Sequence, residues 1–191
     1  MDFLDVIKSR RTVRLFKQDP IDSKVLYELV ECARCAPAGA NRQPLEYVIV
    51  NDSAQVERVF EHLAWAGYVK PKRTPPAGKR PVAYIVVLVN REISKEAPDD
   101  AAASIENILL AAWSLQIGSC WMGAVNREKI AALIEMPENY LIDSVVALGY
   151  PDEEPLMEDC KTDSIKYYLD ANDRLHVPKR ALADIVHENC F

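Results

Sequence analysis

Apolar residues recur along this chain at two spacings, which together predict a mixture of helices and strands. Helical spacing marks five segments, at about residues 3–14, 23–36, 53–63, 99–116 and 126–134. Runs of apolar and β-branched residues predict strands at 47–50, 82–89 and 141–150, with an extended stretch at 119–124. The run at 82–89 is apolar almost throughout, which is typical of a strand covered on both faces. We therefore expect it near the centre of the fold.

Polar and helix-breaking residues divide these segments. Asp22, Asp99 or Asp100, and Asn126 stand before helical runs, where their side chains can cap the first free amides. The helix at 99–116 is apolar around most of its circumference, so we expect it inside the protein or at an interface. Residues 37–44 and 65–81 are loops by their prolines and glycines, and a long irregular segment such as 65–81 commonly covers a site. The tail from about residue 153 is predicted to be polar and irregular until residues 180–186.

Composition and charge narrow the class of protein. With 191 residues, of which 49 % are hydrophobic and 27 % charged, the chain resembles a soluble globular protein, and we expect one domain over residues 1–191. The net charge of −6 disfavours nonspecific binding to nucleic acid or to an anionic membrane. No apolar run is long enough to span a bilayer, and the N-terminal segment has no signal-peptide region. We therefore expect a cytoplasmic protein that binds neither nucleic acid nor membranes.

The most distinctive polar feature is a cluster of arginines near the N-terminus. Arg10, Arg11 and Arg14 surround Thr12, and if the first helix continues through them, Arg10 and Arg14 share a face with Arg11 beside them. Guanidinium groups and a hydroxyl match the oxygens of a phosphate. The alternative is an ordinary solvated basic face. Because the chain is acidic overall, any anion site must be local, and this cluster is the candidate.

Further candidates for ligand contacts lie in the loops and the tail. Asn41 and Gln43 offer both donors and acceptors in the loop at 37–44. Trp65 and Tyr68 are either substrate contacts or core anchors, and a basic pair, Lys179 and Arg180, lies near the C-terminus. No Gly-rich dinucleotide or P-loop sequence, zinc-ligand spacing or serine elbow is present, so we expect no metal ion. The set suits a bound cofactor with a phosphate tail and a flat apolar ring.

Two cysteines provide a competing hypothesis. Cys32 and Cys35 have the spacing of a redox pair, but they also lie about one helical turn apart, where core packing is a sufficient explanation. A cysteine-based redox protein would need both thiols for its activity.

Taken together, four stretches resemble the FMN-dependent nitroreductase family. They are residues 10–14 (Arg-Arg-Thr-Val-Arg), 37–44 (Pro-Ala-Gly-Ala-Asn-Arg-Gln-Pro), 117–124 (Ile-Gly-Ser-Cys-Trp-Met-Gly-Ala) and 177–180 (Val-Pro-Lys-Arg), in the family's order and over nearly the whole chain. The resemblance implies an α+β fold with a mixed, mainly antiparallel sheet flanked by helices. It also implies an intertwined homodimer with two FMN sites at the subunit interface, in which the tail at about 153–191 wraps the partner subunit.

The resemblance also assigns roles to individual residues. Arg10, Arg11, Thr12 and Arg14 would hold the FMN phosphate and ribityl chain, and Arg180 with Lys179 would close on the phosphate. The loop residues Pro37, Ala38, Gly39, Asn41 and Gln43 would contact the flavin, with Asn41 and Gln43 bonding it in the partner's site. Met122 and Gly123 would lie along the ring.

The activity implied is electron transfer in two half-reactions through one site. NAD(P)H would reduce the flavin, and a nitroaromatic, quinone or related small molecule would then take the electrons. Because the cofactor supplies the chemistry, no catalytic acid or base is needed from the protein. Three alternatives stay open: reductive dehalogenation, consumption of the flavin itself, and a non-enzymatic flavin carrier or sensor.

Overall fold

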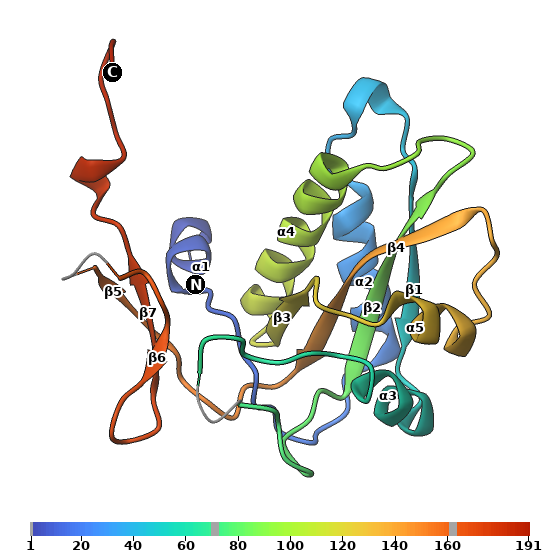
Figure 1. Ribbon diagram of the computed structural model, residues 1–191, viewed down its shortest axis with the longest axis horizontal. Helices are drawn as coiled ribbons and strands as arrows, with labels where there is room; N and C mark the ends of the chain where they lie inside the picture. Colours follow the sequence, from blue (N-terminus) through green and yellow to red (C-terminus); the bar gives the residue numbers. More distant parts are fainter. Residues whose placement is uncertain (1, 70–72, 161–163) are drawn as a thin grey trace.

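An antiparallel sheet forms the centre of the computed structural model, which describes residues 2–69, 73–160 and 164–191 (Figure 1). Its strand order is β1-β2-β4-β3, with every neighbouring pair antiparallel. The strands are β1 (Leu45–Val50), β2 (Ala83–Asn90), β3 (Gly118–Met122) and β4 (Tyr140–Gly149). These ranges agree with the expected strands to within a few residues. The α+β class with a mainly antiparallel sheet is confirmed.

Helices cover both faces of this sheet. Helices α2 (Ser23–Arg34) and α4 (Pro98–Ser114) pack on one face, and α3 (Ser53–Phe60) and α5 (Arg127–Leu133) pack on the other (Figure 1). Alternate residues of β2 supply the two cores: Tyr84, Val86 and Leu88 join the cluster with α3 and α5, whereas Ile85 and Val87 join the cluster with α2 and α4. This two-sided burial explains why the sequence of β2 is apolar without interruption.

The N-terminal helix is shorter than its apolar pattern predicts. Helix α1 (Phe3–Ser9) ends at Ser9, and the chain continues in extended form beside β3. Thr12 forms a parallel bridge with Ser119, and Phe16 forms an antiparallel bridge with Pro151. The prediction that Arg10 and Arg14 share a helical face is therefore wrong. Pairing with β3 gives this stretch backbone partners that a longer helix would have supplied locally.

The tail is also more ordered than predicted. Strands β5 (Leu156–Asp159), β6 (Tyr168–Leu169) and β7 (Leu175–Lys179) form a second sheet in the order β5-β7-β6, followed by the short helix η2 (Leu182–Asp184). Figure 1 shows this sheet standing beside α1, apart from the central sheet. Leu175 packs with Ala66 and Val69, so the loop at 65–69 supplies part of its core. The expectation of an irregular tail is wrong because these contacts come from distant residues.

Two of the three expected helix caps are present. Asp22 accepts from Lys24 N at 2.7 Å, and Asn126 accepts from Lys129 N at 3.2 Å. Helix α4 instead begins after Ala97 with no side-chain cap. Asp100 uses its Oδ1 to accept the amide of Gly39, at 2.9 Å, so it holds the loop at 37–44 against α4. None of the helices in the described parts of the chain is long and apolar enough to cross a membrane.

Candidate cofactor site

Residues 10–16 form an extended segment whose side chains alternate in burial. Arg11, Val13 and Leu15 are buried, whereas Arg10, Thr12 and Arg14 remain partly accessible. Side chains in extended chain alternate between two sides, so the second set shares one side. We call Arg10, Thr12 and Arg14 the basic face. Arg10 and Arg14 therefore share a side because the chain is extended and not because it is helical. The hydroxyl of Thr12 lies between them.

Arg10 has hydrogen-bonding capacity left over. Its Nε lies 3.7 Å from Glu106 Oε1 of α4, which is an ion pair and not a hydrogen bond. This Nε is buried and has no hydrogen-bond partner among the described residues. Ser119 pairs with Thr12 through the backbone, and its buried hydroxyl also lacks a hydrogen-bond partner within residues 2–69, 73–160 and 164–191. Buried polar groups are rarely left unsatisfied, so these two atoms fit a site that binds a polar ligand.

Arg11 faces the other way and serves the end of α1. Its guanidinium donates to the backbone oxygens of Lys8 and Ser9, the contact with Ser9 being 3.3 Å. These carbonyls lie at the helix C-terminus, where no amide of the helix is available for them. Burial, and then the charge of Arg10, lower the pKa of the Arg11 guanidinium below its ordinary value. The geometry gives Arg11 a capping role at the end of α1.

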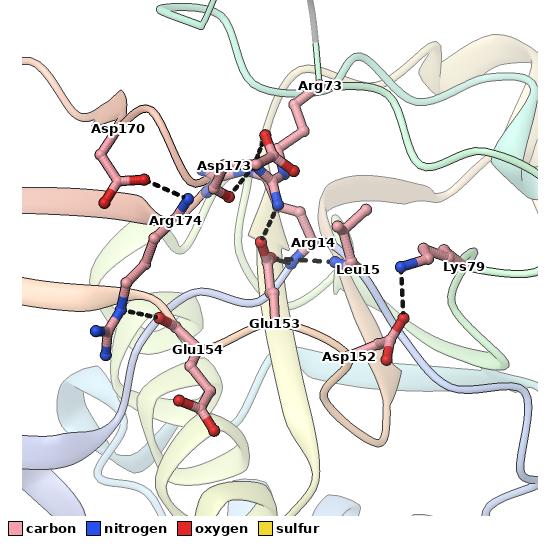
Figure 2. A network of polar contacts seen from close by, with 10 residues as sticks. All are labelled: Arg14, Leu15, Arg73, Lys79, Asp152, Glu153, Glu154, Asp170, Asp173 and Arg174. Atoms are coloured by element: carbon pink, nitrogen blue, oxygen red, sulfur yellow. Dashed lines mark hydrogen bonds and ion pairs between the residues drawn. The ribbon is translucent and has the colours of Figure 1, made fainter.

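Arg14 is held by groups from three other segments. Its guanidinium lies 4.9 Å from the ring centroid of Tyr167, within cation–π range. Its backbone amide and that of Leu15 both donate to Oε1 of Glu153 (Figure 2). Oε2 of the same carboxylate forms an ion pair with Arg73 at 3.0 Å. The position of Arg14 thus depends on residues after β4, in the loop at 65–81 and before β6.

The loop at 37–44 carries backbone strain. Ala40, Asn41 and Gln43 have φ of 51°, 53° and 51°, in the left-handed region. Such a conformation costs on the order of 1–3 kcal/mol for a residue other than glycine and is concentrated at functional sites. Asn41 and Gln43 are exposed, as a ligand-binding role requires.

This loop and the basic face lie toward different ends of α4. The loop is fixed at Asp100 through Gly39, whereas Ser9, next to the basic face, accepts a hydrogen bond from Trp113 Nε1 at 2.8 Å. Asp100 and Trp113 are about 20 Å apart along the helix axis, given a rise of about 1.5 Å per residue. In Figure 1 the loop stands at the beginning of α4, and α1 lies beside its later turns.

The remaining predicted cofactor residues are distributed over two regions. Met122 ends β3 with its side chain buried, and Gly123 follows it at the surface. Lys179 and Arg180 are exposed at the end of β7, and Arg180 donates to the backbone oxygen of Asp184 at 2.8 Å. Among the described residues, Arg10 of the basic face forms an ion pair with Glu106.

The two aromatic candidates have different environments. Trp65 is only 3 % exposed and packs on Phe60 with 5.7 Å between ring centroids, so it anchors the core. Tyr68 is 62 % exposed, and its ring centroid lies 5.2 Å from that of Tyr167. Tyr68 is thus the accessible candidate for a substrate contact. Residues 70–72 of this loop lie outside the described residues.

Neither Cys32 nor Cys120 is an activated thiol. Burial, followed by neighbouring acidic groups, raises the pKa of Cys32, and burial raises that of Cys120 to about 11. Reactive cysteines have a lowered pKa, so both thiols stay protonated near neutral pH. Cys32 and Cys35 are unbonded. No group of three or more metal-ligating side chains gathers within the described ranges.

Sequence reasoning missed Glu153, Arg73 and Tyr167, which hold Arg14 in place. Glu153 stands in an acidic run after Pro151, and Arg73 stands in a loop rich in lysine and arginine. Neither residue differs in type from its neighbours. The pairing of residues 15–17 with residues 150–152 brings Glu153 to the extended segment.

Comparison with known proteins identifies the family. A model of the Nitroreductase family matches residues 7–150, well over half of the chain. A candidate NADH dehydrogenase/NAD(P)H nitroreductase of Archaeoglobus fulgidus is 32 % identical over 181 residues, covering 91 % of this chain and 92 % of the relative. The chain belongs to the nitroreductase family.

Solved structures agree with this fold. A nitroreductase with bound FMN from Bacteroides fragilis matches with a TM-score of 0.66 at 25 % identity, over 86 % of this chain and 96 % of that chain. A candidate nitroreductase in complex with FMN from Desulfovibrio desulfuricans gives a TM-score of 0.71 at 22 % identity, over 100 % and 98 % of the two chains.

Relatives with other named activities are also similar. A 5,6-dimethylbenzimidazole synthase of Rhodospirillum rubrum is 24 % identical, over 80 % of this chain and 84 % of the relative. An iodotyrosine deiodinase of Thermotoga neapolitana is 24 % identical, over 78 % and 88 %. Proteins similar to this chain thus carry more than one named activity.

Proposed function

We propose that this chain is an FMN-dependent NAD(P)H oxidoreductase. It passes electrons in two half-reactions at one site to nitroaromatic, quinone or related small acceptors. The observation that carries the proposal is the basic face, where Arg10, Thr12 and Arg14 share one side of an extended segment. Arg10 Nε is buried there and has no hydrogen-bond partner in the part of the chain that the structure describes. A phosphate oxygen would satisfy that donor. The FMN-bound structures of the two similar proteins support the choice of cofactor.

The protein's residues would bind and orient the cofactor, and bound FMN would supply the hydride and electron chemistry. Arg10, Thr12 and Arg14 would hold its phosphate and ribityl chain, the two arginines by charge-assisted hydrogen bonds. Met122 and Gly123 would lie along the ring, where the buried Met122 would keep water from one side. Arg11 contributes indirectly, because it ends α1 and so starts the extended segment.

The active form is proposed to be a homodimer of single-domain subunits. Strongly exposed apolar side chains on α1 and in the tail support this, since a soluble protein seldom leaves such groups together in water. They are Phe3, Leu4, Ile7, Leu182, Ile185 and Val186. The tail would wrap the partner, bringing Lys179 and Arg180 to a phosphate. Asn41 and Gln43 would complete the partner's site, because they lie toward the end of α4 that is far from α1.

Absorbance spectra of the purified protein test this function. We expect bound flavin that mass spectrometry identifies as FMN, bleaching by NADH or NADPH, and recovery when a nitroaromatic or a quinone is added. A protein that takes up no FMN would contradict the proposal. Bleaching without recovery by any acceptor would favour a carrier or sensor.

Two alternative activities follow from the relatives named above. If the electrons go to a halogenated aromatic or the flavin is itself consumed, nitroaromatics and quinones will be poor acceptors. Release of halide, or loss of the flavin ring in mass spectra, distinguishes these activities from the main proposal. The exposed Tyr68 is where we expect the acceptor to make contact, so Tyr68→Ala should change acceptor preference more than FMN affinity.

A further inference from the structure

The carboxylate of Glu153 joins three segments that are far apart in the sequence. Its side chain is only 6 % exposed, and its Oε1 accepts the amides of Arg14 and Leu15, the latter at 3.1 Å. One acceptor on two consecutive amides fixes the orientation of both peptide groups. Because Arg14 belongs to the basic face, this contact also sets the direction of its side chain (Figure 2).

Arg73 compensates the charge that this arrangement buries. Its side chain is 9 % exposed, and its NH2 lies 3.0 Å from Glu153 Oε2. Glu153 Oε2 and Arg73 Nε are both buried without an aligned hydrogen bond among the described residues, so the contact acts mainly through charge. Arg73 is in turn held at Asp173, through the carboxylate and the backbone oxygen, each at 3.1 Å.

The compensation matters because a phosphate is an anion. A buried carboxylate next to Arg14 would repel a phosphate bound by the basic face and would offset the attraction of one arginine. Arg73 compensates the buried charge of Glu153, so Glu153 can orient the backbone with much less of that repulsion. Asp173, the second carboxylate on Arg73, is 74 % exposed, so water screens its charge.

We propose that Glu153 and Arg73 act together as a positioning pair for phosphate binding: Glu153 orients the basic face, and Arg73 cancels its charge. The inference rests on the proposed function, because it assumes that the basic face binds the phosphate of FMN. It assigns to the loop at 65–81 a role in cofactor affinity beyond contact with the acceptor.

Titrations of apoprotein with FMN and riboflavin test this pair, since riboflavin lacks the phosphate. Arg73→Met should weaken FMN binding about tenfold and should change riboflavin binding far less. The tenfold loss is the effect of one uncompensated charge on the order of 10 Å from the phosphate at an effective dielectric constant near 20. Glu153→Gln keeps an oxygen acceptor and removes the charge, so the ratio of FMN to riboflavin affinity should stay equal or rise. The double variant should return toward the wild-type ratio.

Two further variants complete the design. Glu153→Ala removes the acceptor, so it should lower both stability and the affinity ratio; if it fails to fold, Glu153→Gln and Arg73→Met still decide the question. Arg80→Met is the matched control, because Arg80 forms an ion pair with Glu57 elsewhere in the same loop region and should leave the ratio unchanged.

The outcomes separate this inference from the proposed function. If wild-type protein binds FMN with phosphate preference, but Arg73→Met and Glu153→Gln lower only thermal stability and leave the ratio unchanged, the pair is merely structural and the inference is overturned. If the wild type shows no preference for FMN over riboflavin, the proposed phosphate site itself is wrong, and the inference fails with it. A selective loss in Arg73→Met that the double variant reverses supports the pair.

Discussion

Replacing Gly118 with alanine should push the extended segment away from the edge of the sheet. A Cβ at Gly118 would lie 2.9 Å from Val13 Cβ and 3.0 Å from each of its γ-carbons, closer than carbon atoms pack. Val13 is fully buried, and its amide donates to Ser119 O at 2.9 Å, so its side chain cannot turn into solvent. The strain is relieved by moving the backbone of residues 10–16, which carries the basic face with it.

The expected magnitude follows from this overpacking. Added volume in a filled core typically costs about 1–3 kcal/mol. For a chain of this length, each kcal/mol lowers the melting temperature by about 2–4 °C, so the melting temperature of the apoprotein should fall by roughly 2–12 °C. If one charge-assisted hydrogen bond to the phosphate is lost, at about 1.5–3 kcal/mol, FMN should bind roughly ten- to hundred-fold more weakly.

Thermal unfolding of the apoprotein and fluorescence titration with FMN and riboflavin measure the two effects. Gly67→Ala is the matched control, because a Cβ there meets no atom within 4 Å and its backbone is not left-handed. The reasoning is refuted if Gly118→Ala melts like the control and binds FMN like the wild type. That result would mean that residues 10–16 do not pack on β3 as described.

Three further predictions concern individual side chains. Arg10→Ala and Arg14→Ala should each weaken FMN binding roughly ten- to hundred-fold and riboflavin binding far less, whereas equal losses for the two ligands would remove the phosphate role. Arg11→Ala should lower the melting temperature with little change in the ratio of FMN to riboflavin affinity, because Arg11 caps α1; a selective loss of FMN would assign it to the phosphate instead. Hydrogen bonding to Glu158, and then to Asp170, raises the pKa of His176 above 6.5. Protonated His176 therefore stabilises the second sheet fully below about pH 6.5, and this stabilisation is lost as the pH rises through the raised pKa. An NMR titration of the imidazole should have its midpoint above 6.5 in the wild type and a lower midpoint in Glu158→Gln, and a wild-type midpoint at or below 6.5 would contradict this.

The sequence by itself determined the central elements of the fold and the family. Unbroken apolar residues in β2 predicted a strand covered on both faces, and residues 99–116 predicted the helix that became α4. Asp22 and Asn126 marked helix starts, because capping depends only on residues within one turn. These features could be predicted because periodicity and caps are local properties of the chain.

Only the tertiary structure decided how the candidate site is built. Residues 10–16 have enough apolar residues to continue a helix, but pairing with Ser119 of β3 makes them extended. That pairing separates Arg11 from the other two arginines, since neighbouring side chains then point to opposite sides. Asp100, expected as a cap, holds Gly39 instead.

The partners of Arg14 illustrate the same limit. Glu153 is 139 residues further along the chain than Arg14, and nothing in its local sequence distinguishes it from the other acids around it. Its role arises because the end of β4 and the extended segment run side by side, which buries its carboxylate against two amides and Arg73. Residue types could nominate the arginines for a phosphate, whereas long-range packing decides which of them share the basic face and what holds them there.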